Sequence, residues 1–164
     1  MSNESIPVEL VGVRIELPTN TPIALLREVG GSRFLPIWIG ANEATAIALA
    51  LEGVEPQRPM THDLLKEVTA SLGARVDRVV VTELRDGIYY ADLVLARDAG
   101  EITISARPSD SIALAARTGA PIFVLPAVLE EAGVEIRDED EEDEVARFRS
   151  FLQEVTPEDF GSTG

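Results

Sequence analysis

Residues 74–107 read "ARVDRVVVTELRDGIYYADLVLARDAGEITISAR", and this stretch decides the fold. It contains three runs rich in β-branched and aromatic residues, which are typical of strands. Asp86-Gly87, a pair favoured in two-residue hairpin turns, separates the first two runs, and a second turn is expected around residues 98–100. The stretch therefore predicts three consecutive antiparallel strands.

The chain before this stretch predicts a second group of strands. Residues 11–17, "VGVRIEL", place apolar side chains on one side and Gly12, Arg14 and Glu16 on the other, which is the period of a half-buried strand. Two further strands are expected at residues 22–28 and 33–39, separated by a turn at Gly30-Gly31. These runs predict an N-terminal meander.

Helices are expected between and after the two strand groups. The first is apolar over most of residues 44–51, with Asn42 as a cap and Gly53 at its end. The second is expected to be capped by Thr61 and to end at Gly73. Its predicted buried face is formed by Leu64, Leu65, Val68 and Leu72.

A third helix is expected after Pro108, capped by Ser109 or Asp110 and ending at Gly119, before a short strand at residues 121–125. Strands linked by hairpins predominate over helices in this order. The predicted fold is a single α+β domain over residues 1–134, a mixed, mainly antiparallel sheet with helices packed on it.

The remainder of the chain has a different composition. Of the formal net charge of −15, residues 130–164 contribute −10, through 13 acidic and 3 basic side chains. Residues 135–144 are interpreted as a solvated acidic linker, and residues 145–164 as a short amphipathic helix and tail. Such a tail is suited to binding a basic protein partner.

Composition also limits the location and chemistry. The chain has no cysteine, which excludes disulfides, thiolate nucleophiles and cysteine-rich zinc sites. No run approaches the roughly 20 apolar residues of a membrane span, and the N-terminus has no basic segment followed by an apolar one. The sequence therefore predicts a cytoplasmic protein.

Two helix starts carry the candidate site residues. "RPMTHDLL" at residues 58–65 contains the single histidine, His62, beside Asp63, with Arg58 before it. Histidine can act as acid or base near neutral pH, and arginine can bind phosphate through two N–H groups. Thr61 at the cap and the helix N-terminus behind it would also favour an anion. The alternative is an ordinary helix start, with Asp63 opposite the buried face and complementing the helix dipole.

"ARPSDS" at residues 106–111 repeats this arrangement, with Arg107, Ser109 and Asp110. If the two helix starts converge, they would form an anion site with two arginines, two acids and one imidazole. An N-cap role for Asp110 alone is the alternative.

Glu43, near the start of the first helix, is a further candidate catalytic residue. With Asp63 and Asp110 it could hold Mg²⁺ or Mn²⁺ through oxygen ligands, but no sequential carboxylate motif supports this, and a glutamate that only complements the helix dipole is the alternative. Trp38, Tyr89 and Tyr90 could stack on bases, but Trp38 and one of the tyrosines are expected in the core.

Three blocks together resemble the bifunctional nuclease domain family: "LPIWIGANEATAIALALEG", "RPMTHDLL", and "DGIYYADL" followed by "ARPSDSIALA". The resemblance covers roughly residues 7–134, and the acidic tail is similar to that of actinobacterial members. It implies a domain that cleaves both RNA and DNA and is active as a wedge-shaped homodimer. Dimerisation is expected through residues 44–51 or the meander strands.

Two functions are therefore expected from the sequence. The first is a nuclease that hydrolyses phosphodiester bonds with low sugar specificity, using His62, Asp63, Asp110 and Glu43 in catalysis and Arg58, Thr61, Arg107 and Ser109 in substrate binding. The second is a non-catalytic oligomeric adaptor or regulator whose acidic tail binds a basic partner.

Overall fold

A computed structural model describes residues 4–136 of the 164-residue chain. Residues up to Val134 belong to one compact unit, which carries all the features below except the last residue of the final strand. The amphipathic helix expected at residues 145–164 and almost all of the expected acidic linker lie outside the described residues.

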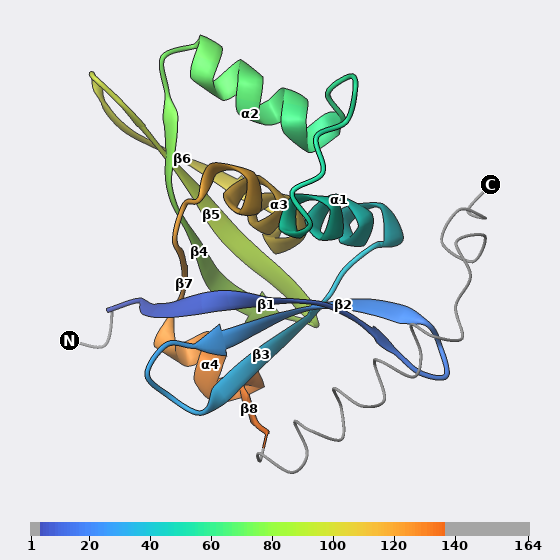
Figure 1. Ribbon diagram of the computed structural model, residues 1–164. Coiled ribbons are helices and arrows are strands. Elements are labelled where there is room, and N and C mark those ends of the chain that lie inside the picture. Colours follow the sequence, from blue (N-terminus) through green and yellow to red (C-terminus); the bar gives the residue numbers. More distant parts are fainter. Residues whose placement is uncertain (1–3, 137–164) are drawn as a thin grey trace. The chain divides into compact units, whose positions relative to one another are not determined.

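Two meanders of three antiparallel strands form most of the sheet (Figure 1). The first comprises β1 (Ile6–Glu16), β2 (Thr21–Glu28) and β3 (Arg33–Trp38), and the second comprises β4 (Arg75–Arg85), β5 (Ile88–Arg97) and β6 (Gly100–Ala106). Asp86 and Gly87 both have positive φ, as a tight turn between β4 and β5 requires. Both expected meanders are confirmed.

The short strand β7 (Ile122–Val124) joins the two meanders into one mixed sheet. It pairs parallel with β4 and antiparallel with β1. With β8 (Val134–Glu135), the strand order is β6-β5-β4-β7-β1-β2-β3-β8. The expected α+β class with a mainly antiparallel sheet is therefore confirmed.

Each meander is followed by a helix, and the two helices pack on each other. These are α1 (Ala41–Leu51) and α3 (Pro108–Thr118), and α2 (Thr61–Ser71) packs on α3 in turn. A short helix that the sequence did not predict, α4 (Pro126–Ala132), follows β7 and lies on the other side of strands β1–β3 from α1 (Figure 1).

The helix starts differ from the predicted caps. The residues at the cap positions are Gly40, Met60 and Arg107, and none of them forms a side-chain hydrogen bond as a cap. The predicted caps, Asn42, Thr61, Ser109 and Asp110, lie within the helices instead. Proline fits the first turn of a helix, so α3 begins at Pro108 and Asp110 falls inside its first turn. The predicted helix ends at Gly53, Gly73 and Gly119 agree with the structure.

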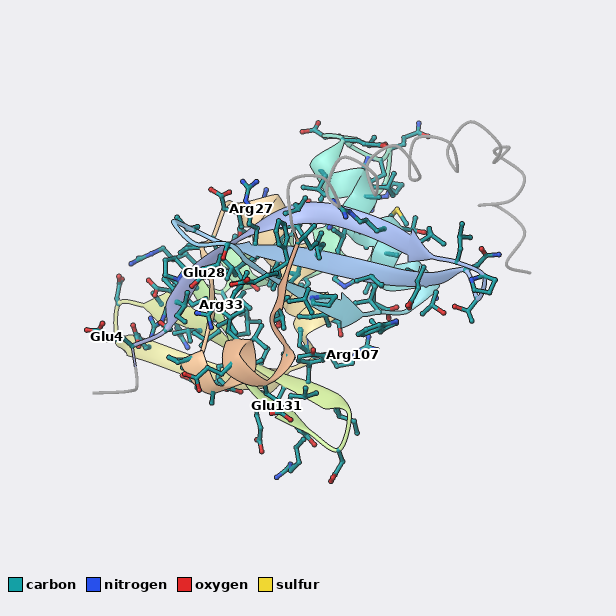
Figure 2. The ribbon with its side chains drawn as sticks, turned by 90° about the horizontal axis from the view of Figure 1, so that it is seen from below. Glu4, Arg27, Glu28, Arg33, Arg107 and Glu131 are labelled. Carbon is teal, nitrogen blue, oxygen red and sulfur yellow. The ribbon has the colours of Figure 1, made fainter. Side chains whose placement is uncertain are left out.

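Ion pairs connect neighbouring side chains on the first meander (Figure 2). Arg27 of β2 pairs with Glu9 of β1 at 2.7 Å, and both side chains are about half exposed. Arg33 donates two hydrogen bonds to Glu28 on the adjoining strand. Within residues 4–136, no helix is long and apolar enough to cross a membrane.

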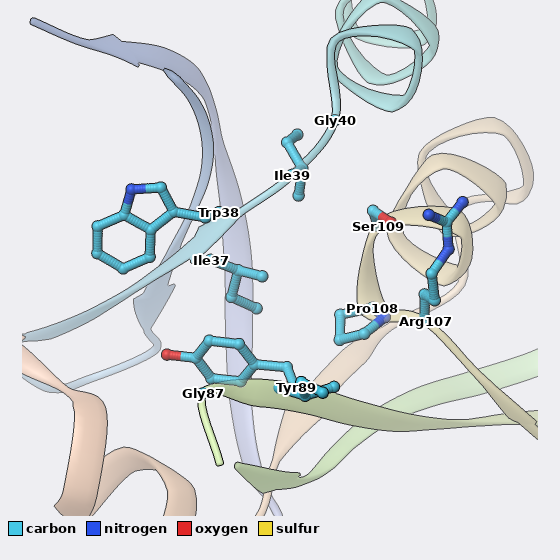
Figure 3. Close-up of a pocket in the computed structure, with 10 residues that line it drawn as sticks. Ile37, Trp38, Ile39, Gly40, Gly87, Tyr89, Arg107, Pro108 and Ser109 are labelled. Atoms are coloured by element: carbon cyan, nitrogen blue, oxygen red, sulfur yellow. The ribbon is translucent and has the colours of Figure 1, made fainter. Parts of the chain in front are cut away.

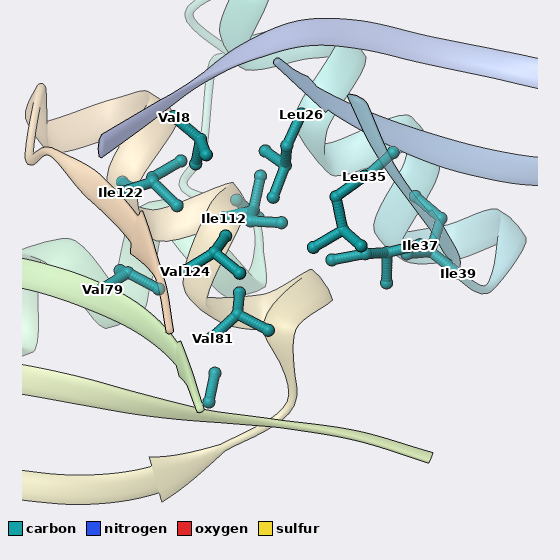
Figure 4. Close-up of a cluster of buried hydrophobic side chains, with 14 of the residues drawn as sticks. Val8, Leu26, Leu35, Ile37, Ile39, Val79, Val81, Ile112, Ile122 and Val124 are labelled. Atoms are coloured by element: carbon teal, nitrogen blue, oxygen red, sulfur yellow. The ribbon is translucent and has the colours of Figure 1, made fainter. Parts of the chain in front are cut away.

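The core lies where both meanders, β7 and the helices α1, α3 and α4 meet (Figure 4). The largest fully buried side chains come from all of these elements: Leu26, Leu35, Ile37, Ile47, Ile112, Leu114, Leu129, Val79, Val81 and Val124. Burying a side chain of this size contributes about 1.5–3 kcal/mol. The core fixes α1 and α3 against the sheet and so positions their first turns.

The predicted buried face of α2 is wrong. Leu64, Leu65, Val68 and Leu72 are all exposed, and Thr69 is the buried residue of this helix. Helix α2 packs through its polar side instead, and its apolar side faces outward. The apolar pattern correctly indicated a helix, but it did not indicate which side the rest of the chain covers.

Candidate functional site

The starts of α2 and α3 meet. The His62 Nε2 atom lies 3.0 Å from Asp110 Oδ1, although the two residues are 48 positions apart. The imidazole is 11% exposed, and the Asp110 side chain is 34% exposed. A carboxylate at this distance holds the ring in one orientation and favours the tautomer that carries its proton on Nε2. His62 and Asp110 thus form an imidazole–carboxylate pair.

Arg107 extends this pair to the start of α1. Its Nε donates to Asp110 Oδ2 at 2.8 Å, and its Nη2 donates to Glu43 Oε1 at 2.8 Å. Glu43, His62, Arg107 and Asp110 therefore form one connected group, here called the interhelix cluster. It joins the first turns of α1, α2 and α3.

Gly40 leaves the space that Glu43 uses. A Cβ atom at position 40 would lie 2.3 Å from Glu43 Oε2, far closer than atoms approach without bonding. With glycine there, the carboxylate of Glu43 folds back over the start of α1, where the helix dipole favours negative charge. The dipole role expected for Glu43 and its contact with Arg107 are thus compatible.

A second ion pair holds α2 on α3. Arg117 Nε donates to Asp63 Oδ1 at 2.7 Å, and the Arg117 side chain is 7% exposed. Asp63 Oδ2 also accepts the backbone N–H of Met60 at 3.0 Å. The prediction that Asp63 points away from the body of the chain is wrong, because Asp63 lies on the side of α2 that packs.

The electrostatic environment keeps Asp110 and Asp63 ionised. Partial burial raises the pKa of Asp110, but hydrogen bonds from Arg107 and His62 outweigh this effect, so the pKa lies below its ordinary value. The hydrogen bond from Arg117 lowers the pKa of Asp63. Hydrogen bonds to Asp110 and Glu43 raise the pKa of Arg107. The cluster thus consists of charged groups around one histidine.

The other expected substrate-binding residues are more scattered. Arg58 and Thr61 are exposed, Arg58 in the loop before α2 and Thr61 as the first residue of that helix. Arg58 has no hydrogen bond or ion pair with any residue that the structure describes. Ser109 is buried, with 6% of its surface exposed. Only Arg107 of these four joins the interhelix cluster.

The three carboxylates expected to share a divalent ion do not gather. Glu43 pairs with Arg107, whereas Asp63 pairs with Arg117. Residues 4–136 contain no group of three aspartate, glutamate, histidine or cysteine side chains placed to hold one metal ion. The metal site predicted from Glu43, Asp63 and Asp110 is therefore wrong in its choice of ligands.

A cavity of about 350 Å³ opens beside Arg107 (Figure 3). Residues at and just after the end of β3, at the β4–β5 turn and the start of β5, and at the start of α3 line it. Trp38 lies at its edge and is 52% exposed, with its Nε1 donating to Glu16 at 2.7 Å, so the prediction that Trp38 belongs to the core is wrong. Tyr89 is half-buried and donates its hydroxyl to the carbonyl of Pro36.

Sequence reasoning missed Arg117 and the cavity. Arg117 stands in the last turn of α3, where a basic residue ordinarily complements the helix dipole, so its position gave no sign of a partner. The spacing of Asp63 and Arg117, 54 positions apart, carries no local signal. The cavity depends on three segments that only the folded chain brings together.

Comparison with known proteins identifies the family of this chain. The bifunctional nuclease domain family matches residues 24–137, which include all four members of the interhelix cluster. The chain belongs to this family. The resemblance expected from three sequence blocks is therefore confirmed.

Relatives differ in how much of the chain they match. An uncharacterized protein of Mycobacterium tuberculosis is 50% identical over 164 residues, covering 95% of this chain and 98% of that protein. Bifunctional nuclease 1 of Arabidopsis thaliana is 32% identical over 114 residues, covering 66% of this chain and 35% of that protein. Bifunctional nuclease 1 of Oryza sativa subsp. japonica is 33% identical over 105 residues, covering 62% of this chain and 32% of that protein. The matched part of this chain thus covers about a third of the length of each plant protein.

Proposed function

We propose that the chain is a nuclease that hydrolyses phosphodiester bonds in both RNA and DNA. The observation that carries the proposal is the contact of His62 with Asp110, which Arg107 also holds. Phosphodiester hydrolysis needs a group that moves a proton and a cation that stabilises charge on the phosphoryl oxygens. The interhelix cluster places one of each at the meeting point of three helix starts.

His62 and Asp110 are assigned to proton transfer. With its Nε2 proton donated to Asp110, the neutral imidazole carries its lone pair on Nδ1. Nδ1 takes a proton from the attacking water as the water oxygen bonds to phosphorus. The bond from phosphorus to the leaving ester oxygen breaks, this oxygen takes a proton from solvent water, and the imidazolium then returns its proton to solvent. Asp110 stays ionised, as its lowered pKa requires, and stabilises the imidazolium that forms.

Arg107 is assigned to the phosphate. Its guanidinium has five N–H donors, of which the bonds to Asp110 and Glu43 use two. The side chain is 64% exposed, so a phosphate can reach the remaining donors. Glu43 keeps the guanidinium oriented, and Asp63 holds α2 in place through Arg117. Arg58 and Thr61 stay predicted substrate-binding residues.

The proposal is tested on RNA and DNA oligonucleotides of one base sequence, labelled at the 5′ end. Protein purified from a host lacking its major nucleases should cleave both, and no cleavage of either would refute the proposal. Low sugar specificity predicts rates of the same order on the two oligonucleotides. Titrating the rate with a chelator and then with Mg²⁺ or Mn²⁺ tests whether cleavage depends on a metal ion.

The adaptor function depends on the acidic tail, most of which lies outside the described residues. Truncation after Gly133 separates the two functions. A nuclease should keep or gain activity without the repelling charges, whereas an adaptor should lose a basic protein partner.

We also propose that the chain forms a homodimer, and a cytoplasmic location stays a prediction. Residues Ala44, Ala46 and Ile47 of α1 are buried within the chain, which leaves less of that helix for a second copy. The apolar side of α2 is exposed and is the better candidate for the contact.

A further inference from the structure

The cavity beside Arg107 has two apolar sides. Ile37 and Ile39 point across it toward Pro108 and Ser109, and Tyr89 closes one end (Figure 3). Trp38 projects from the opposite side of the same segment, at the cavity's edge. The volume of about 350 Å³ lies in the range of roughly 300–1,000 Å³ that is usual for small-molecule sites. This volume and lining suit a small, largely apolar group.

Ser109 gives this apolar cavity a polar group without a partner. The residue is 94% buried, yet its hydroxyl makes no hydrogen bond to any residue that the structure describes. Among the described residues, no buried side-chain oxygen or nitrogen lacks a hydrogen-bond partner, so the unpaired Ser109 hydroxyl is accessible from the cavity. It can therefore donate to, or accept from, the polar edge of a ligand.

Arg107 stands where this cavity meets the interhelix cluster. Among residues 4–136, Arg107 alone both lines the cavity and hydrogen-bonds to Asp110 and Glu43. Its free N–H donors are suited to a phosphate. An occupant should therefore carry a flat apolar ring with polar edges next to a phosphate, which describes a nucleotide.

We propose that this cavity binds one unpaired nucleobase of the substrate. The base lies between Ile39 and Pro108, the Ser109 hydroxyl bonds to its edge, and the adjoining phosphate binds Arg107. The inference rests on the proposed nuclease function and adds the base subsite to it. A base paired within a duplex cannot enter the cavity without leaving its stack.

Binding is measured on the full chain with two probes, adenosine 5′-monophosphate and ribose 5-phosphate, which lacks the base. Trp38 is the single tryptophan of the chain and lies at the cavity's edge, so its fluorescence reports occupancy. Calorimetry on the same samples gives the affinity independently. The nucleotide should bind at least about tenfold more tightly than the sugar phosphate, since base contacts contribute substantially in such sites.

Two variants test where the base binds. Ser109→Ala should weaken nucleotide binding about fivefold or more and leave binding of the sugar phosphate unchanged. Ile88→Glu adds a carboxylate to an exposed residue of the cavity lining and should weaken both probes. The matched control is Ile102→Glu, on the exposed strand β6 outside the cavity lining, which should change neither affinity.

Equal affinity for the two probes would overturn the inference, as would unchanged nucleotide binding in both cavity variants. If the chain cleaves oligonucleotides but binds no mononucleotide, the subsite is refuted and the nuclease function stands. If it binds the mononucleotide with the expected variant pattern but cleaves nothing, the cavity inference stands and the nuclease function is refuted.

Discussion

Helix α2 carries His62 but contributes almost nothing to the apolar core, so its position depends on polar contacts. Thr69 is its buried residue. Its polar links to α3 are His62 with Asp110, Asp63 with Arg117, and a hydrogen bond from Lys66 to the Arg117 carbonyl. Replacing Arg117 with methionine keeps the aliphatic stem and removes the charge. The variant Arg117→Met therefore tests whether this ion pair holds the helix.

The expected loss of stability follows from the geometry of the pair. Removing one partner of a buried ion pair costs about 3–5 kcal/mol, and a hydrogen bond to a charged group contributes about 1.5–3 kcal/mol. Arg117 is 7% exposed, but Asp63 is 24% exposed and retains the N–H of Met60. The cost should therefore lie near the low end, about 2–3 kcal/mol.

Urea denaturation measures the free energy of unfolding of Arg117→Met, of Asp63→Asn and of the double variant. The coupling between the two substitutions should be about 1–3 kcal/mol. The matched control is Arg27→Met, which breaks the exposed pair with Glu9 and should cost at most about 1 kcal/mol. A loss for Arg117→Met no larger than that of the control, or a coupling near zero, would refute the reasoning.

The same pair predicts a pH dependence. The folded chain lowers the pKa of Asp63, so its stabilisation is fully present above the ordinary aspartate pKa of about 4 and is lost as the pH falls toward the lower folded-state value. The difference in stability between the wild type and Asp63→Asn should therefore be constant from about pH 5 to 7 and shrink below about pH 4. A difference that grows on acidification would contradict this assignment.

Three further outcomes are expected. Gly40→Ala should displace the Glu43 carboxylate and lower the affinity for an oligonucleotide severalfold. It should change the free energy of unfolding by less than about 1 kcal/mol, because the flexible Glu43 side chain can move away. An unchanged affinity would count against the orienting role of Glu43. Leu65→Lys together with Leu72→Lys should shift the chain from dimer to monomer in light scattering. The free energy of unfolding should not fall, because both residues are exposed. A persistent dimer would exclude the apolar side of α2 as the dimer contact. Arg117→Met should also lower the cleavage rate at least about tenfold under folding conditions, by displacing the imidazole; full activity would show that α2 needs no such support.

The sequence predicted the two meanders because their signals are local. Alternating strands and the Asp86-Gly87 turn specify hairpins within a few residues of each other. It did not predict that β7 would join the meanders, since three residues carry little pattern and the partners are distant in the chain. Parallel pairing with β4 depends on the whole chain having folded.

The fold brings four of the predicted site residues together, and their role in catalysis stays a prediction. His62, Asp110, Arg107 and Glu43 were all named from their positions at helix starts, and these starts converge. The buried face of α2 was predicted wrongly because an apolar helix side favours burial against some partner, but it does not show that the same chain provides that partner.

The central claim is that His62 and Asp110 act together in cleaving phosphodiester bonds. Single-turnover cleavage of one labelled RNA oligonucleotide by the wild type, His62→Gln, Asp110→Asn and the control Arg27→Met tests it most directly. The account predicts that the first two substitutions each reduce the rate about 100-fold or more, that the double variant is little slower than either, and that the control keeps the wild-type rate. Wild-type rates in both His62→Gln and Asp110→Asn would contradict it.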